Sequence, residues 1–308
     1  VEPPLEIRRF FHDISNSVQV FFDYPQNLDN AREQLRPFIK HMTGAQTVVD
    51  VAIFHPGVVQ HLQGSQNNFP VHSYNLAEQG RDLFDYDLVD ENLIAAGALD
   101  RYRVLVYVQG QVTEEDTLER ILAWIRQGGT LVTARLDQVV TIENDDSLWK
   151  EIMNSGRKIV APETGGRSWF DSENCQAFRL GTGAVIKTNY NPEKYTPEQY
   201  RPLAAVVERA AYYLTDLGPG FQNAPLVDGA RDKIDTTLLP GRILYYNGTD
   251  QPAAKEVNLR PEDWNNRLMQ PEGFHHRLQL PPHSIISIPL VESTNGDSTS
   301  AATQNCCR

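Results

Sequence analysis

Acidic side chains gather at two places where they could act on a sugar. Asp87, Asp90 and Glu91 stand in one short stretch, and Asp171 and Glu173 follow an aromatic pair in another. Glycoside cleavage needs an acid and a base held at a defined separation across the sugar, and nearness in sequence does not establish that separation. Carboxylates at a strand end more often cap the next element. We therefore expect capping at Asp90 and Glu91, and we assign no catalytic residue.

Aromatic and histidine side chains give no stronger signal. Trp169 could stack on a sugar, although core packing is the commoner fate of such a ring. The eight histidines include His55 and His61 around one loop and the adjacent pair His275-His276. Neighbouring strand residues point to opposite faces, so such a pair rarely binds one ion. Without a His-Glu-x-x-His spacing, we expect no metal site.

Nucleophile and phosphate motifs are also missing from the sequence. The first strong strand leads into His55-Pro56-Gly57-Val58, which is neither a Gly-x-Gly-x-x-Gly nor a Walker loop, so we expect no nucleotide cofactor. Cys175, Cys306 and Cys307 are too few for a disulfide scaffold, and we interpret Cys175 as structural. The odd count leaves at least one thiol free or intermolecular. The redox state of Cys306 and Cys307 stays open.

Charge and composition exclude two classes of partner. The formal net charge is −12 and Lys and Arg form no cluster, which disfavours nucleic acid and allows a neutral sugar or a protein partner. No run of eighteen apolar residues predicts a membrane span. The chain begins at Val1 without a Met or an apolar signal core, which indicates a processed form or a piece of a longer protein. Asn247-Gly248-Thr249 matches a glycosylation sequon, as sequences often do by chance. Cellular location stays undetermined, with a lean towards secreted or periplasmic.

The elements that must position these residues begin with buried strands. Apolar, β-branched runs at 47–54, 103–108 and 130–134 are typical of buried strands, and 86–90 predicts a shorter one. A helix is expected after Thr113, with Asp116 completing a variant capping box. Strands alternating with helices over short links predict right-handed crossovers and a parallel sheet.

Further elements flank this core. We expect helices at 28–42, where Pro37 weakens the pattern, and at 74–83, 146–154 and 197–214. Residues 176–180 and 184–188 read as a hairpin. After Gly218-Pro219-Gly220 the sequence changes to short strands separated by turn residues, which is typical of a small antiparallel β-sandwich. The expected strands are 234–238, 242–246, 255–259, 275–280 and 284–290.

This pattern predicts four parts of the chain. An N-terminal helical extension covers 1–44, a doubly wound α/β domain 45–217, the β-sandwich 218–292 and a tail 293–308. Ligands of open parallel sheets bind beyond the carboxyl ends of the strands. We therefore expect a ligand or partner rim there. Its candidate residues are His55, Asp90, Glu91, Gln109, Arg135, Asp137 and Trp169.

The stretches 84–91, 99–106 and 122–132 together resemble the amidotransferase-like domain of family 42 glycoside hydrolases, the β-galactosidases. The likeness covers roughly residues 45–215 and continues more weakly at 241–247 and 281–285. It implies a flavodoxin-like, class I amidotransferase-like domain, called the trimerisation domain in that family. Such a domain associates subunits and walls one side of the active site of a catalytic (β/α)8 barrel.

The resemblance assigns no catalysis to this chain. The family's two catalytic glutamates lie on barrel strands, and no eightfold series of strands and helices occurs here. An amidotransferase would carry its nucleophile at the turn after the strand 103–108, where this chain has Gln109-Gly110-Gln111, and an amide cannot serve as a nucleophile. The implied partners are the barrel, as a domain or subunit, carbohydrate and further copies of the chain.

Two alternatives remain open. The chain could be a stand-alone glycan hydrolase that uses Asp90 and Glu91 or Cys175, or a carbohydrate-binding or scaffold protein without a catalytic partner. Turnover of chromogenic glycosides that is lost in Glu91→Gln would favour the first. Replacing Gln109 or Glu91 by Ala should weaken association or ligand binding if the rim assignment holds.

Overall fold

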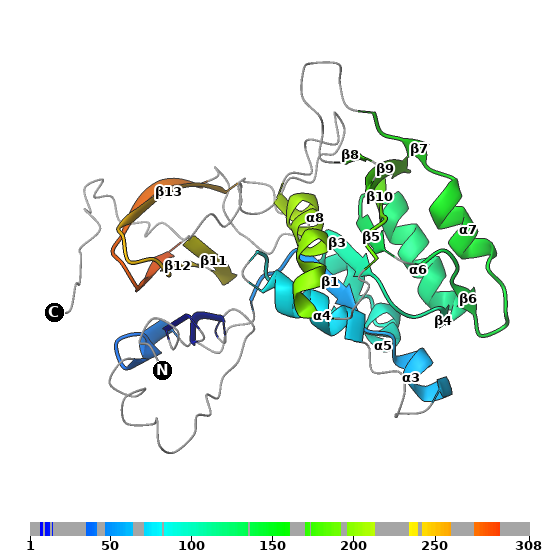
Figure 1. The fold of residues 1–308 in the computed structure, drawn as a ribbon, viewed down its shortest axis with the longest axis horizontal. Coiled ribbons are helices and arrows are strands. Elements are labelled where there is room, and N and C mark those ends of the chain that lie inside the picture. Colours follow the sequence, from blue (N-terminus) through cyan, green and yellow to red (C-terminus); the bar gives the residue numbers. More distant parts are fainter. Residues whose placement is uncertain are drawn as a thin grey trace. The chain divides into compact units, whose positions relative to one another are not determined.

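The computed structural model of the 308-residue chain divides into two compact units (Figure 1). We call Val49–Arg231 the α/β unit, and Val1–Val48 together with Asp232–Arg308 the split unit. The N-terminal residues therefore share a unit with the C-terminal strands. The structure describes residues 7, 8, 10–12, 14, 35–41, 47–63, 71–81, 83–134, 136–160, 170–172, 174–191, 196–212, 234–239, 242–259 and 274–289.

A mixed, mainly parallel sheet forms the centre of the α/β unit. Its strand order is β2-β1-β3-β5-β10-β9-β7, with β8 paired to β9. Strands β2, β1, β3, β5 and β10 run parallel, while β9 is antiparallel to β10. The bounds are β1 Val51–Phe54, β2 Tyr86–Val89, β3 Val104–Tyr107, β5 Thr130–Ala134, β7 Arg157–Lys158, β8 Asp171–Ser172, β9 Cys175–Leu180 and β10 Gly183–Thr188. The predicted strands and hairpin are confirmed, and the second hairpin strand extends the parallel sheet.

Helices cover this sheet and bury its apolar side chains. The bounds are α3 Gly57–Gln63, α4 Val71–Gly80, α5 Glu91–Ala95, η2 Ala98–Arg101, α6 Glu115–Arg126, α7 Ser147–Asn154, η3 Pro197–Tyr200 and α8 Arg201–Tyr212. Ile53 and Val106 pack with the side chains of α4 and α8 in one buried cluster. Alternation along the strands sends Phe54 and Tyr107 to the other face, where the Tyr107 ring lies 5.4 Å from that of Trp149 on α7. Both faces of the sheet are therefore buried.

Two expected helix details are wrong. Thr113 does not begin α6, because its backbone belongs to β4 (Val112–Thr113), which pairs with β6 (Val140–Thr141). Glu114 is the N-cap of α6, without a side-chain hydrogen bond, and Asp116 pairs with Arg120 instead. The expected helix at 28–42 is wrong at residues 36–41, which form a turn and the 3₁₀ helix η1 (Ile39–His41), because Pro37 cannot continue an α-helical ladder. Apart from Leu35, the rest of that helix lies outside the described residues.

The split unit contains antiparallel strands at all five predicted places. One sheet has the order β11-β12-β15, and β13 pairs with β14. The bounds are β11 Ile234–Leu239, β12 Arg242–Asn247, β13 Ala253–Leu259, β14 Phe274–Leu280 and β15 Ser284–Pro289. Alternating apolar residues with turn formers between the runs produce this pattern.

The N-terminal residues of the split unit pack on its three-stranded sheet. Phe10, Phe11 and Ile14 join Leu244 and Tyr246 in one buried cluster, and the Phe11 ring stacks on Tyr246 at 5.6 Å. Polar bonds add to this contact. They are His12 Nε2 to Asp235 Oδ2 at 3.3 Å and Val48 N donating to Leu238 O at 2.8 Å. The two ends of the chain therefore build one core.

No described helix is long and apolar enough to cross a membrane.

Candidate functional site at the carboxyl edge of the sheet

The parallel strands all end at one edge of the sheet, which we call the carboxyl edge. From β1 the chain adds β2 on one side of the sheet, and it then crosses back to add β3, β5 and β10 on the other side. The direction of the connections therefore reverses between β1 and β3. Open parallel sheets bind ligands outside the carboxyl ends of their strands at such a reversal. His55 directly follows β1 and Gln109 lies two positions after β3, so both stand at the candidate site.

The carboxylates near this edge bind backbone amides. Glu91 is 3% exposed, and its Oε2 and Oε1 accept hydrogen bonds from Gly57 N at 2.8 Å and Val58 N at 3.2 Å. Asp90 is the N-cap of α5, where Leu93 N donates to its Oδ1 at 2.8 Å. Both carboxylates cap helices, as expected, but Glu91 caps the preceding α3 across the edge instead of its own helix.

Asp87 lies before these residues, on β2. Its Oδ2 accepts from Tyr102 OH at 2.7 Å and from Arg101 Nη2 at 3.0 Å. Burial, followed by this carboxylate, raises the pKa of Tyr102. Asp87 therefore serves a polar cluster with residues near η2.

Gln109 ties the beginning of α4 to the edge. Its Oε1 accepts from His72 N at 3.0 Å, and Ser73 Oγ donates to Phe54 O at 2.8 Å. The His72 ring is hydrogen-bonded to Tyr200 OH. Sequence reasoning did not select His72 or Tyr200, because 128 residues separate them and no local pattern links them.

The rings of His55, after β1, and Tyr74, on α4, lie in contact near the carboxyl edge. The backbone N of His55 donates to Val89 O at 2.8 Å, and its ring meets the Tyr74 ring edge-on at 5.6 Å. Tyr74 is 38% exposed. Aromatic faces of this kind can pack against a sugar or a protein side chain.

At the position of Gly110, the turn after β3 has no room for a side chain. Gly110 has a φ of +105°, and a Cβ placed there would lie 2.6 Å from the Cβ of Pro56. Tyr107 OH donates to Gly110 O at 2.9 Å, which fixes the turn. The backbone at Gly110 therefore disfavours any L-residue, including a Ser or Cys nucleophile.

The other candidates are spread over the unit. Asp137 is exposed on the loop after β5, while Arg135 and Trp169 lie outside the described residues, as do Glu173, Cys306 and Cys307. Cys175 is buried on β9, and burial raises the pKa of its thiol to about 11, so the thiolate that would act as nucleophile is scarce near neutral pH. That agrees with a structural role for Cys175.

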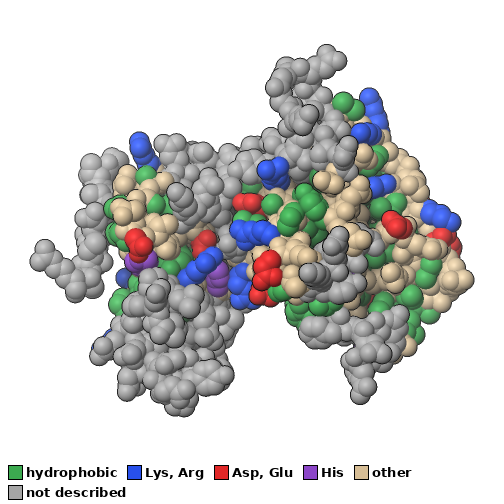
Figure 2. Space-filling model, in the orientation of Figure 1, with side chains coloured by type: hydrophobic (Ala, Val, Ile, Leu, Met, Phe, Trp, Pro, Cys, Tyr) green, Lys and Arg blue, Asp and Glu red, His purple; other side chains and the backbone are tan. Residues whose placement is uncertain are grey.

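Metal-binding side chains do not gather in the described ranges, and side chains of one charge do not gather on the face in Figure 2. Among those residues, no group of three or more His, Cys, Asp or Glu side chains could hold a metal ion. His61 Nδ1 lies 2.7 Å from Gly57 O within α3, while His275 and His276 are in register with Asn258 and Val257 on β13. On the face in Figure 2, basic and acidic side chains of the described part are interspersed.

This geometry defines a mixed α/β protein with a parallel-dominated sheet and additional antiparallel sheets. No protein-family model and no curated protein matches the chain. Among solved structures, Gan42B, a GH42 β-galactosidase from G. stearothermophilus, is similar with a TM-score of 0.50 and 12% identity. That match covers 93% of this chain and 50% of the other.

Two further β-galactosidases give similar matches. The cold-adapted enzyme from Rahnella sp. R3 has a TM-score of 0.48 and 12% identity, covering 85% of this chain and 44% of its own. The enzyme from Bacillus circulans sp. alkalophilus has a TM-score of 0.48 and 9% identity, covering 86% and 45%. The chain therefore spans half or less of the length of these three solved structures. At these identities, the Gan42B match shows a likeness of fold.

Proposed function

We propose that this chain is the non-catalytic part of a GH42-like glycoside hydrolase that acts on carbohydrate. Its role is to assemble subunits and to wall one side of an active site that a catalytic (β/α)8 barrel supplies. The likeness in fold to a GH42 β-galactosidase over 93% of this chain and 50% of that enzyme supports the connection to glycosidases.

The α/β unit is proposed to be a doubly wound domain of the flavodoxin and class I amidotransferase type. Numbered along the chain, its parallel strands β2, β1, β3, β5 and β10 have the order 2-1-3-4-5. That order is the flavodoxin-like one, and helices lie on both faces of the sheet. We further propose that the C-terminal strands form a small β-sandwich and keep the domain limits 45–217 and 218–292.

The observation that carries the non-catalytic role is the occupied carboxyl edge. The buried Glu91 holds two backbone amides, Gln109 holds a third, and a side chain at the position of Gly110 would collide with Pro56. Hydrolysis requires a base or nucleophile that can reach its substrate. These three groups instead fix the loops of the edge.

Two exposed leucines beside this edge support the proposal of association. The carboxylate of Glu91, the first residue of α5, binds the first two residues of α3, so the two helices begin side by side. Leu62 on α3 is 60% exposed and Leu93 on α5 is 46% exposed. We call these two helices the α3–α5 surface. The proposed occupant is a second copy of the chain.

The experiment compares the 308-residue chain with the double variant Leu62→Asp/Leu93→Asp by sedimentation. Self-association that weakens at least about tenfold in the double variant supports the assignment, because charges at an apolar interface lose its burial energy. Val160→Asp is the matched control, since Val160 is 69% exposed and follows β7, at the end of the sheet opposite β2. Equal association of all three proteins rejects the α3–α5 surface.

A separate assay addresses chemistry. The chain is expected to leave chromogenic β-galactosides and other glycosides uncleaved when assayed without a barrel. Turnover that disappears in Glu91→Gln would establish the competing hydrolase reading. Mixing the chain with a barrel-containing polypeptide then tests the walling role through a change in substrate affinity.

A further inference from the structure

The side chain of Asn247 makes five hydrogen bonds within the split unit. This residue ends β12 and is 0% exposed. Its Nδ2 donates to Gln251 O at 2.8 Å, Pro281 O at 3.0 Å and Leu280 O at 3.2 Å. Its Oδ1 accepts from Thr249 N at 3.0 Å and from Thr249 Oγ1 at 2.8 Å. Every polar atom of this amide is therefore occupied.

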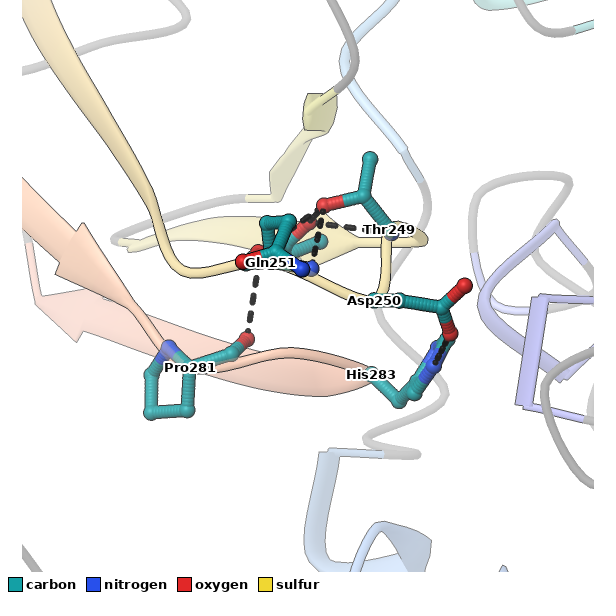
Figure 3. A network of polar contacts seen from close by, with 6 residues as sticks. Thr249, Asp250, Gln251, Pro281 and His283 are labelled. Carbon is teal, nitrogen blue, oxygen red and sulfur yellow. Dashed lines mark hydrogen bonds and ion pairs between the residues drawn. The ribbon is translucent and has the colours of Figure 1, made fainter.

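These bonds join two turns that are distant in sequence. Thr249 and Gln251 lie in the turn after β12, and Pro281 lies between β14 and β15 (Figure 3). The Asn247 amide therefore holds both turns. His283 Nε2 lies 2.7 Å from Asp250 Oδ1 at the rim of the same network. The backbone of Asn247 also pairs with Ile234 on β11 and Ser284 on β15.

Asn247 is followed by Gly248, a sequence with its own covalent chemistry. The backbone nitrogen of Gly248 can attack Cγ of Asn247, losing its proton as Nδ2 leaves as ammonia and a cyclic succinimide forms. Water then adds to one succinimide carbonyl and breaks a ring C–N bond, which yields aspartate or isoaspartate. Glycine permits the ring closure because no side chain hinders its nitrogen.

We infer that Asn247-Gly248 is a deamidation site that the fold keeps closed and that opens only when the two turns separate. Ring closure requires the side-chain carbon to swing towards the next backbone nitrogen. Five side-chain hydrogen bonds and two strand neighbours restrain this movement. Deamidation would replace the donor Nδ2 by a carboxylate oxygen, which can only accept hydrogen bonds. That oxygen would face the same three carbonyl oxygens, so the two turns of a converted molecule do not come together again.

The buried Nδ2 of Asn247 is also the atom to which a glycan of the Asn247-Gly248-Thr249 sequon would be attached. In the folded chain this atom is buried and donates to the backbone carbonyl oxygens of Gln251, Leu280 and Pro281. In the folded chain, the match to Asn-x-Thr is therefore a structural turn.

The test incubates the whole chain at mildly alkaline pH, folded and in urea, and follows aspartate and isoaspartate at Asn247 by peptide mass spectrometry. We expect the folded chain to react at least about tenfold more slowly, since only locally opened molecules are reactive. Asn295-Gly296 is the second Asn-Gly pair in the sequence. Its deamidation rate in the urea sample gives a reference rate for an Asn-Gly pair in the unfolded chain. Equal rates at Asn247 in both states overturn the inference.

Variants assign the protection to the network. Thr249→Ala removes the hydroxyl that bonds Oδ1 and should accelerate deamidation of the folded chain, while Thr249→Ser keeps the hydroxyl and should restore the slow rate. Thr182→Ala removes an exposed turn hydroxyl in the α/β unit and should leave the rate unchanged. If Thr249→Ala fails to fold, the Thr249→Ser chain still gives the comparison with urea. A folded Thr249→Ala chain with the parent's rate overturns the role of the network.

Discussion

At the residue scale, the polar side chains near the carboxyl edge bind the protein's own backbone. Glu91 and Gln109 accept from amides at the beginnings of α3 and α4. A buried carboxylate needs such partners, because an unpaired one would be costly to desolvate. The same residue types that suggested a rim for ligands therefore organise the loops of that rim.

His41 gives the split unit a pH-dependent stability. It is 5% exposed, and burial, followed by the charges of Lys40 and Arg242, lowers its pKa to about 4 from 6.5. Between these two values the unfolded chain binds a proton that the folded chain does not. The stability is thus fully present above pH 6.5 and falls as the pH drops towards 4, by at most about 1.4 kcal/mol per pH unit.

The check is to measure the free energy of unfolding from pH 7 to pH 4 for the parent and His41→Gln. The variant should show a flatter dependence over that range, whatever its absolute stability. A parental slope in His41→Gln would show that other groups set the dependence.

At the element scale, α3 depends on a residue from another helix. It has seven residues, and its first amides are capped by Glu91 from α5. Glu91→Ala should cost about 1–3 kcal/mol by leaving these amides unpaired, and Glu91→Gln should cost less. Hydrogen exchange should rise in peptides from 57–63. Glu143→Ala, at an exposed turn position, should stay within about 0.5 kcal/mol of the parent.

The turn after β3 is the second element with a strict demand. Gly110→Ala meets both a left-handed φ and the Pro56 ring, and should destabilise the chain by about 1–3 kcal/mol or more. Gly97 has a φ of +85° with no atom within 4 Å of an added Cβ, so Gly97→Ala isolates the backbone strain. Thermal melts of the two variants give the comparison. Equal losses of stability in the two variants would mean that the Pro56 ring moves aside at little cost.

At the scale of the whole molecule, the two units have separate cores. Phe11 is 0% exposed and stacks on Tyr246 within the split unit, so Phe11→Ala should cost about 3–5 kcal/mol there. Hydrogen exchange should increase in 234–247 while peptides from 104–134 keep their protection. Increased exchange in both sets would show that the units unfold as one.

The sequence predicted the elements of this molecule well. The runs at 130–134 and 104–107 became strands because β-branched residues suit a sheet buried on both faces. The five C-terminal strands followed from alternation and turn residues. Capping by Asp90 was also a local prediction, since its partner Leu93 is three residues away. By contrast, Thr113 and Asp116 formed a convincing capping pattern, and the pairing of Thr113 with Thr141 overrode it.

Long-range pairing was decided only by the tertiary structure. Glu91 reaches α3 across 34 positions, His72 meets Tyr200 across 128, and His12 meets Asp235 across 223. The sequence by itself determined which segments are strands and helices, because periodicity and turn chemistry act between near neighbours. The fold decided which polar groups meet, because closing such long loops depends on the burial of a whole core and leaves no local trace.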